Sequence, residues 1–186
     1  ATVVVYATFQ TLQLQVLHNV PPIGAAYLFM LSSLAWSATA LVVATWRGRM
    51  ETAGIILGSV TLLIGTAGLA YFVVSGPVYL IAIFIAISGA GIGFANNLLI
   101  RRAIRSVPDA EKSIAGSSVQ AIRTVGVAFG AAAAGLVAVA VGLKSESATI
   151  ETVGHAMRWV YGFDVIIAAV SLSIALGMVA TARRQT

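Results

Sequence analysis

The chain has 186 residues, of which 59% are hydrophobic and only 9% are charged, and its mean hydropathy is +0.97. Because soluble domains carry about 25% charged residues, this composition excludes an ordinary soluble globule. The chain has no cysteine, which excludes disulfides and cysteine-based metal sites. The net charge of +5 has to be interpreted from where the few charges fall along the chain.

Six stretches are apolar enough for membrane helices, each of which needs roughly 20 mostly apolar residues. In chain order they cover 2–17, 24–46, 52–74, 78–100, 114–143 and 160–180. The connections are short, so neighbouring spans run antiparallel. The amphipathic stretch HAMRWVYGF precedes the last span, and we expect that helix to begin ahead of its apolar run. We therefore predict an all-α polytopic membrane protein whose residues 1–186 form one six-helix domain.

The basic residues gather on one side of the predicted membrane. Antiparallel spans place the connections 47–51 and 101–113 and the C-terminus on the same side. That side carries eight basic residues, namely Arg47, Arg49, Arg101, Arg102, Arg105, Lys112, Arg183 and Arg184. The other side carries only Lys144 and Arg158. The positive-inside rule makes the first side cytoplasmic, which explains the basic charge without a nucleic-acid partner.

The first span carries unusual polarity, because Gln10, Gln13 and Gln15 lie close together in it. Buried amides need hydrogen-bond partners, which either water or another helix can supply. Two interpretations therefore remain open: the glutamines line a water-filled cavity, or they bond to a neighbouring helix.

The fifth span contains Arg123 on a polar stripe with Gln120. At 1.5 Å per residue, Arg123 lies roughly 12–15 Å inside the cytoplasmic end of this helix. Ionisable groups at such depth usually face the bundle interior or a cavity. Asn96 and Asn97 have a compatible depth, whereas we expect Asp164 to be an interfacial residue near the start of the last helix, helped by the helix dipole.

Small residues recur at intervals of four in three spans, and in the third span they are Gly54 and Gly58. Gly89 and Gly93 share one helical face, and Gly126 and Gly130 share another. Such stripes let helix backbones approach closely in lipid. Helix packing is the expected role, and sliding or bending of the helices during a conformational cycle is the alternative.

No metal site or cofactor is expected. His18 and His155 fall in connections on the outer side, without a second ligand at metal-binding spacing, and we expect both to be solvated. An intramembrane serine protease needs a serine with a base within hydrogen-bond reach. The serine-containing stretches VSGP and GSSVQ do not fit this requirement, so we expect the protein not to be an enzyme.

Three stretches together resemble a known family. They are QVLHNVPPIGA at 15–25, SSLAWSATALVVATWRGRMETAGIILG at 32–58 and SVPDAEKSIAGSSVQAIRTVGVAFGAAAAG at 106–135. In order and spacing they are similar to the C-terminal six-helix half of a major facilitator superfamily transporter, of the fourteen-span drug:proton antiporter type.

The resemblance implies proton-coupled efflux of small amphipathic molecules by alternating access across the plasma membrane. It implies a partner, the N-terminal six- or eight-helix half, and a central cavity between the halves. The cavity residues would then be Gln10, Gln13, Gln15, Asn97, Gln120 and Arg123. A channel or a non-transporting membrane subunit is the alternative function.

The connection 47–51 resembles the family's cytoplasmic loop, which would make Arg47, Arg49 and Glu51 part of a conformational loop. It departs from the family pattern because no aspartate precedes the arginines and Glu51 follows them instead. Glu51 is spaced to pair with Arg47 across one helical turn.

Overall fold

The protein is built of long helices. The computed structural model describes residues 13–142 and 149–183, with side chains up to residue 178. Its helices are α2 (Pro22–Val43), α3 (Arg49–Phe72), α4 (Val78–Arg105), η1 (Asp109–Glu111), α5 (Lys112–Ala140) and α6 (Ile150–Arg183). Within these ranges there is no strand, and five helices are long and apolar enough to cross a membrane. The chain is therefore a multi-pass α-helical membrane protein.

The helix boundaries differ from the predicted spans where charged residues continue a helix. The predicted connection 101–113 is wrong in extent, because α4 runs to Arg105 and α5 begins at Lys112. The predicted connection 47–51 is likewise shorter, since Arg49 already begins α3. The early start of the last helix is confirmed, because α6 begins at Ile150. Most of the predicted span 2–17 lies outside the described residues, and residues 13–18 are helical.

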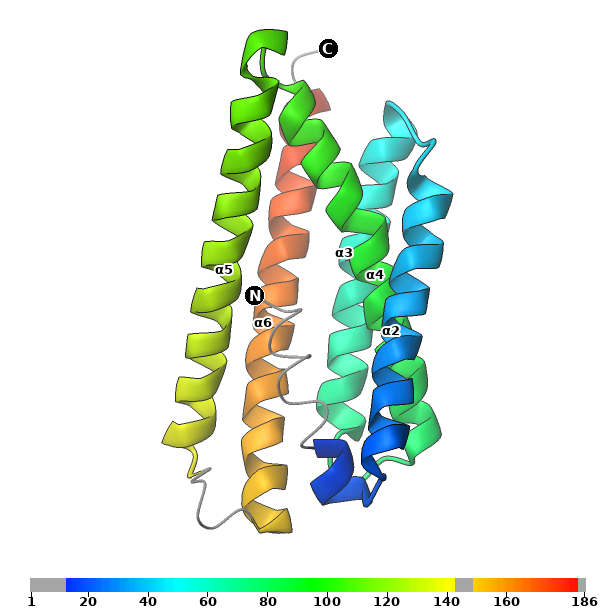
Figure 1. Cartoon of the computed structure of the whole chain (residues 1–186), viewed down its shortest axis with the longest axis vertical. Coiled ribbons are helices and arrows are strands. Elements are labelled where there is room, and N and C mark those ends of the chain that lie inside the picture. Colours follow the sequence, from blue (N-terminus) through cyan, green and yellow to red (C-terminus); the bar gives the residue numbers. More distant parts are fainter. Residues whose placement is uncertain (1–12, 143–148, 184–186) are drawn as a thin grey trace.

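The helices run up and down along one long axis (Figure 1). The α2–α3 and α4–α5 connections lie at one end, which carries Arg47, Arg49, Arg102 and Arg105 and is called the basic end below. The α3–α4 connection and the start of α6 lie at the other end, called the opposite end. This alternation is the antiparallel order that short connections impose.

α4 packs directly on the backbone of α2. A Cβ added at Gly89 would overlap the backbone oxygen of Ser32, and one added at Gly93 would overlap the backbone oxygen of Trp36. Thr39 of α2 also joins the two helices, because its hydroxyl donates a hydrogen bond to the Ala90 carbonyl oxygen of α4 at 3.2 Å. Glycine at positions 89 and 93 is therefore what lets these two helices touch.

The other side of α4 packs on α3 in the same way. A Cβ at Gly58 would overlap Ala95 and the Gly91 carbonyl oxygen, and a Cβ at Gly65 would overlap Ser88. In lipid, helices gain no hydrophobic energy from associating, so close packing of small residues is a main source of their affinity. α2, α3 and α4 form the most closely packed part of the bundle.

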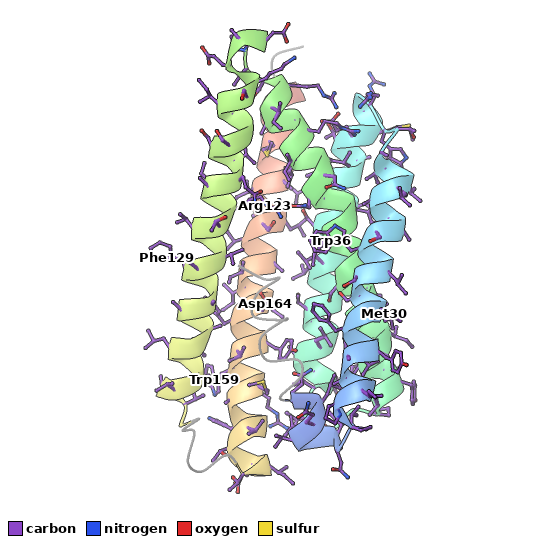
Figure 2. All side chains as sticks on the ribbon, in the orientation of Figure 1. Met30, Trp36, Arg123, Phe129, Trp159 and Asp164 are labelled. Atoms are coloured by element: carbon purple, nitrogen blue, oxygen red, sulfur yellow. The ribbon has the colours of Figure 1, made fainter. Side chains whose placement is uncertain are left out.

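α5 is held much more loosely than α4. Its contacts with the described helices are few, and it is packed mainly on α6 through Ala134, Ala138 and Val160. A Cβ at Gly126 would meet no atom within 4 Å, whereas Gly130 is buried. The predicted packing role of Gly126 has no counterpart among the described helices and stays a prediction. Phe129 points away from the bundle and is 74% exposed (Figure 2).

Replacing Gly93 with alanine should destabilise the bundle, because the added methyl group overlaps backbone atoms of α2 that cannot rotate away. We expect a loss of about 1–3 kcal/mol in the free energy of unfolding, as for other overpacked contacts. Unfolding of the purified protein in mixed detergent micelles measures it.

Gly135→Ala is the matched control, because a Cβ at Gly135 in α5 meets nothing within 4 Å. Alanine favours helix by up to about 1 kcal/mol over glycine, so this variant should be as stable as the parent or more stable. Equal stability of the Gly93 and Gly135 variants would contradict the packing described for α2 and α4.

Candidate functional site

A stripe of polar side chains follows α5, and all of its members are exposed. The Arg123 Nη1 atom donates a hydrogen bond to the Gln120 Oε1 atom at 3.4 Å. The Thr124 and Ser117 hydroxyls donate to backbone oxygens of their own helix. A guanidinium has five N–H donors, and within the described part of the chain Gln120 is the only side chain that accepts from Arg123. Arg123 is therefore free to bind a ligand.

A cavity of about 500 Å³ lies beside Arg123, where α4, α5 and α6 approach the basic end. Its lining residues are Asn96, Leu99, Ile100, Arg102, Ala103, Ser106, Val119, Arg123 and Met178, and it is called the arginine cavity below. The structure thus brings Arg123 together with Asn96 and Arg102. Asn97 is exposed and does not line this cavity.

Of the predicted glutamines of the first span, Gln13 and Gln15 do not join Arg123. Gln10 lies outside the described residues. Gln13 is fully buried, and neither amide atom of its side chain has a hydrogen-bond partner among the described residues. Gln15 is half-buried. Gln13 and Gln15 precede the turn into α2 at the opposite end, whereas Arg123 lies towards the basic end.

Asp164 lies inside the bundle, and the prediction that it is interfacial near a helix N-terminus is wrong. α6 begins at Ile150, so Asp164 is roughly 20 Å along the helix at 1.5 Å per residue. It is 1% exposed and follows the fully buried Tyr161 by one turn. Figure 2 shows Asp164 between the levels of Trp159 and Arg123. The early start of the amphipathic helix is what carries this carboxyl group away from the surface.

An ion pair joins α3 to α4 at the basic end. Glu51 is 5% exposed and lies 3.3 Å from the Arg105 Nη1 atom. The predicted pairing of Glu51 with Arg47 is wrong, because Arg47 precedes the first residue of α3 and does not share its helical face. Thr52, next to Glu51, accepts a hydrogen bond from the Arg102 Nη1 atom at 3.4 Å.

Arg101 closes the C-terminal end of α2. Its Nη1 atom donates to the Ala44 carbonyl oxygen at 2.6 Å, and its Nη2 atom donates to the Trp46 carbonyl oxygen at 2.7 Å. The last carbonyls of a helix have no partner within the helix, and basic side chains commonly satisfy them. Two arginines of α4 therefore hold the predicted conformational loop: Arg101 binds Trp46 just before it, and Arg105 binds Glu51 at its end.

At the opposite end, His18 binds a backbone carbonyl group at the C-terminal end of α3. Its Nε2 atom lies 2.8 Å from the carbonyl oxygen of Val73, the residue that follows the last turn of α3. The expectation that His18 is solvated is wrong, because this ring nitrogen is in a hydrogen bond to the backbone of another segment.

The sequence left several of these contacts unrecognised. Arg101, Arg102 and Arg105 were expected in a connection, because their charges interrupt the apolar run. Their spacing of three and four residues is helical and places them on neighbouring faces of one helix. That spacing was the signal that they belong to α4. Comparison with protein families, with curated proteins and with solved structures found no match to this chain.

Removing the Arg101 side chain should open the end of α2. We expect Arg101→Ala to lower the free energy of unfolding by about 1.5–3 kcal/mol, which is typical of hydrogen bonds to a charged group. Arg101→Lys should recover only part of this, because one ammonium cannot replace a fork that reaches two carbonyls. Unfolding in mixed micelles gives both values.

Arg47→Ala is the matched control for Arg101, because Arg47 is an exposed arginine at the same end. Its free energy of unfolding should stay within about 0.5 kcal/mol of the parent. Equal losses in the Arg47 and Arg101 variants would mean that general charge, not the contact with α2, is responsible.

Proposed function

We propose that this chain is one half of a secondary active transporter similar to the major facilitator superfamily, and that it takes part in proton-coupled efflux of small amphipathic molecules. Its partner would be an N-terminal half of six or eight helices. The substrate would cross by alternating access through a cavity between the halves.

The exposed polar stripe of α5 is the observation that carries this proposal. Arg123, Gln120 and Thr124 lie exposed on a helix that is long and apolar enough to span the membrane. A charged group in lipid is costly, by about 2.5–3.5 kcal/mol at the bilayer centre on insertion scales, and such groups usually mark a substrate or ion pathway. The stripe therefore favours contact with water, a substrate or a second helical half over contact with lipid.

The uneven packing of the bundle also supports a transporter. α2, α3 and α4 are locked by glycine contacts, whereas α5 touches its described neighbours sparsely. Alternating access needs rigid groups of helices that rock about a site between them. A helix that carries the polar stripe and is weakly attached to the rigid group suits a cavity wall.

The basic end is proposed to face the cytoplasm of a cell whose plasma membrane holds the protein. Cytoplasmic loops carry an excess of lysine and arginine, and this end carries Arg47, Arg49, Arg102 and Arg105. Under this orientation the arginine cavity is reached from the cytoplasm, which is where an efflux substrate is collected.

The orientation can be tested with single cysteines, because these 186 residues contain none. A membrane-impermeant maleimide should label Ser75→Cys, at the opposite end, in intact cells. Ser106→Cys, at the basic end, should be labelled only after the cells are made permeable. The reverse pattern would contradict the proposed orientation.

Transport itself should be saturable and driven by a proton gradient. The protein that contains this chain, with its natural flanking sequence, is reconstituted in liposomes and offered anionic, zwitterionic and cationic fluorescent amphiphiles. Arg123→Gln should raise the KM of the transported probe by at least about tenfold, the loss of one charged hydrogen bond.

Arg158→Gln is the control for this measurement, because Arg158 is an exposed arginine at the opposite end. Its KM should equal that of the parent. A flux that does not saturate and is accompanied by single-channel currents would replace the transporter with a channel. Absence of any flux with a proton gradient would favour a non-transporting subunit.

A further inference from the structure

The arginine cavity combines two positive charges with a mainly apolar wall. Arg102 and Arg123 both line it, and none of its lining residues is acidic. The remaining lining is largely aliphatic, from side chains such as Leu99, Val119 and Met178. A site of this kind matches a molecule with one anionic group and one apolar part.

Two of the three acidic side chains near the basic end are in ion pairs, and the third, Glu111, is exposed and does not line the arginine cavity. Glu51 is in the ion pair with Arg105, and Asp109 is in an ion pair with Lys112. In the described part of the chain no carboxylate lies within ion-pair distance of Arg102 or Arg123. Among the described residues, therefore, no carboxylate compensates the charges of the two arginines at the cavity.

Thr52 positions the Arg102 side chain, which still has free N–H groups for a ligand. Its Nη1 atom bonds to the Thr52 hydroxyl at the long distance of 3.4 Å, which leaves other N–H groups of the planar guanidinium for a second acceptor. Arginine recognises phosphate and carboxylate groups through two parallel hydrogen bonds. Arg123 has the same capacity, since among the described residues its side chain hydrogen-bonds only to Gln120 of the same helix.

The cavity extends along the membrane axis. Arg102 and Ser106 lie at the last residues of α4 and just beyond it, whereas Asn96 lies roughly 9 Å deeper at 1.5 Å per residue, near the level of Arg123 on α5. The volume of about 500 Å³ is within the usual range for small-molecule sites. It has room for an anionic head together with part of an apolar chain.

We propose that the arginine cavity binds an anionic amphiphile, with a phosphate or carboxylate held by Arg102 and Arg123 and an apolar chain against Leu99, Val119 and Met178. The ligand is either a soluble amphipathic anion or the head of an anionic phospholipid, which share this chemistry. Its role as a substrate site rests on the proposed function, whereas the binding does not.

Native mass spectrometry of the detergent-solubilised protein, with its natural flanking sequence, tests the proposal. The probes are octyl phosphate against octylammonium, and phosphatidylglycerol against phosphatidylcholine. We expect the Kd of the first bound octyl phosphate to be at least about tenfold lower than the Kd of octylammonium. If phosphatidylglycerol binds equally selectively and displaces octyl phosphate, the natural ligand is a lipid; if it does not, the ligand is a soluble anion.

Variants show whether binding of octyl phosphate depends on the charge of the two arginines or on the space in the cavity. Arg123→Gln and Arg102→Gln should each raise the Kd of octyl phosphate by about tenfold, as expected for one lost charged contact. Val119→Trp keeps both arginines but fills the cavity with a larger side chain, so it should weaken the binding of octyl phosphate. If the Val119→Trp protein does not fold, Ala103→Leu is used in its place. Arg47→Gln, at the same end but outside the cavity, should bind like the parent.

The proposal is overturned if octyl phosphate and octylammonium bind alike. It is also overturned if the preference for the anion survives in both Arg102→Gln and Arg123→Gln. If the protein binds the anion selectively but shows no flux, the anion site is supported and the transporter proposal is rejected. If it shows proton-driven flux but no selectivity for the anion, the transporter proposal is supported and the anion site is rejected.

Discussion

The architecture depends on the close approach of α4 to the backbones of α2 and α3. Apolar side chains cannot drive this association in lipid, because the acyl chains are as apolar as the helices. Gly89 and Gly93 remove the Cβ atoms that would separate α4 from α2, and Gly58 and Gly65 do so on the α3 side. Everything else in the bundle is arranged around this core of touching backbones.

The same packing explains why polar chemistry collects on α5. Helices packed at backbone distance have little room for long polar side chains, and α4 approaches α2 and α3 most closely at Gly58, Gly65, Gly89 and Gly93. α5 touches them sparsely and leaves space beside Arg123, which the arginine cavity occupies. The long basic side chains of α4 reach outward at its end, where Arg102 faces this space and Arg105 meets Glu51.

Hydropathy was enough to predict the helical membrane class and most of the described helices, because one long apolar run suffices to identify each. Hydropathy failed where α4 continues through charged residues to Arg105, since the helical period persists there while the apolar signal stops. The amphipathic stretch before Asp164 did predict an early start of α6, but not that the helix begins as early as Ile150. Contacts between segments were beyond reach. The sequence spacing of Glu51 and Arg47 suggested a local pair, but the partner of Glu51 comes from α4.

The Arg101 contact has a consequence for biosynthesis. The guanidinium that satisfies the Ala44 carbonyl lies 57 residues further along the chain. While α2 and α3 enter the membrane one after the other, α4 does not yet lie beside them, and water must solvate the end of α2. The hairpin is completed only when α4 arrives. Nascent chains that stall before α4 therefore carry a helix end whose carbonyl groups lack the donors that Arg101 supplies.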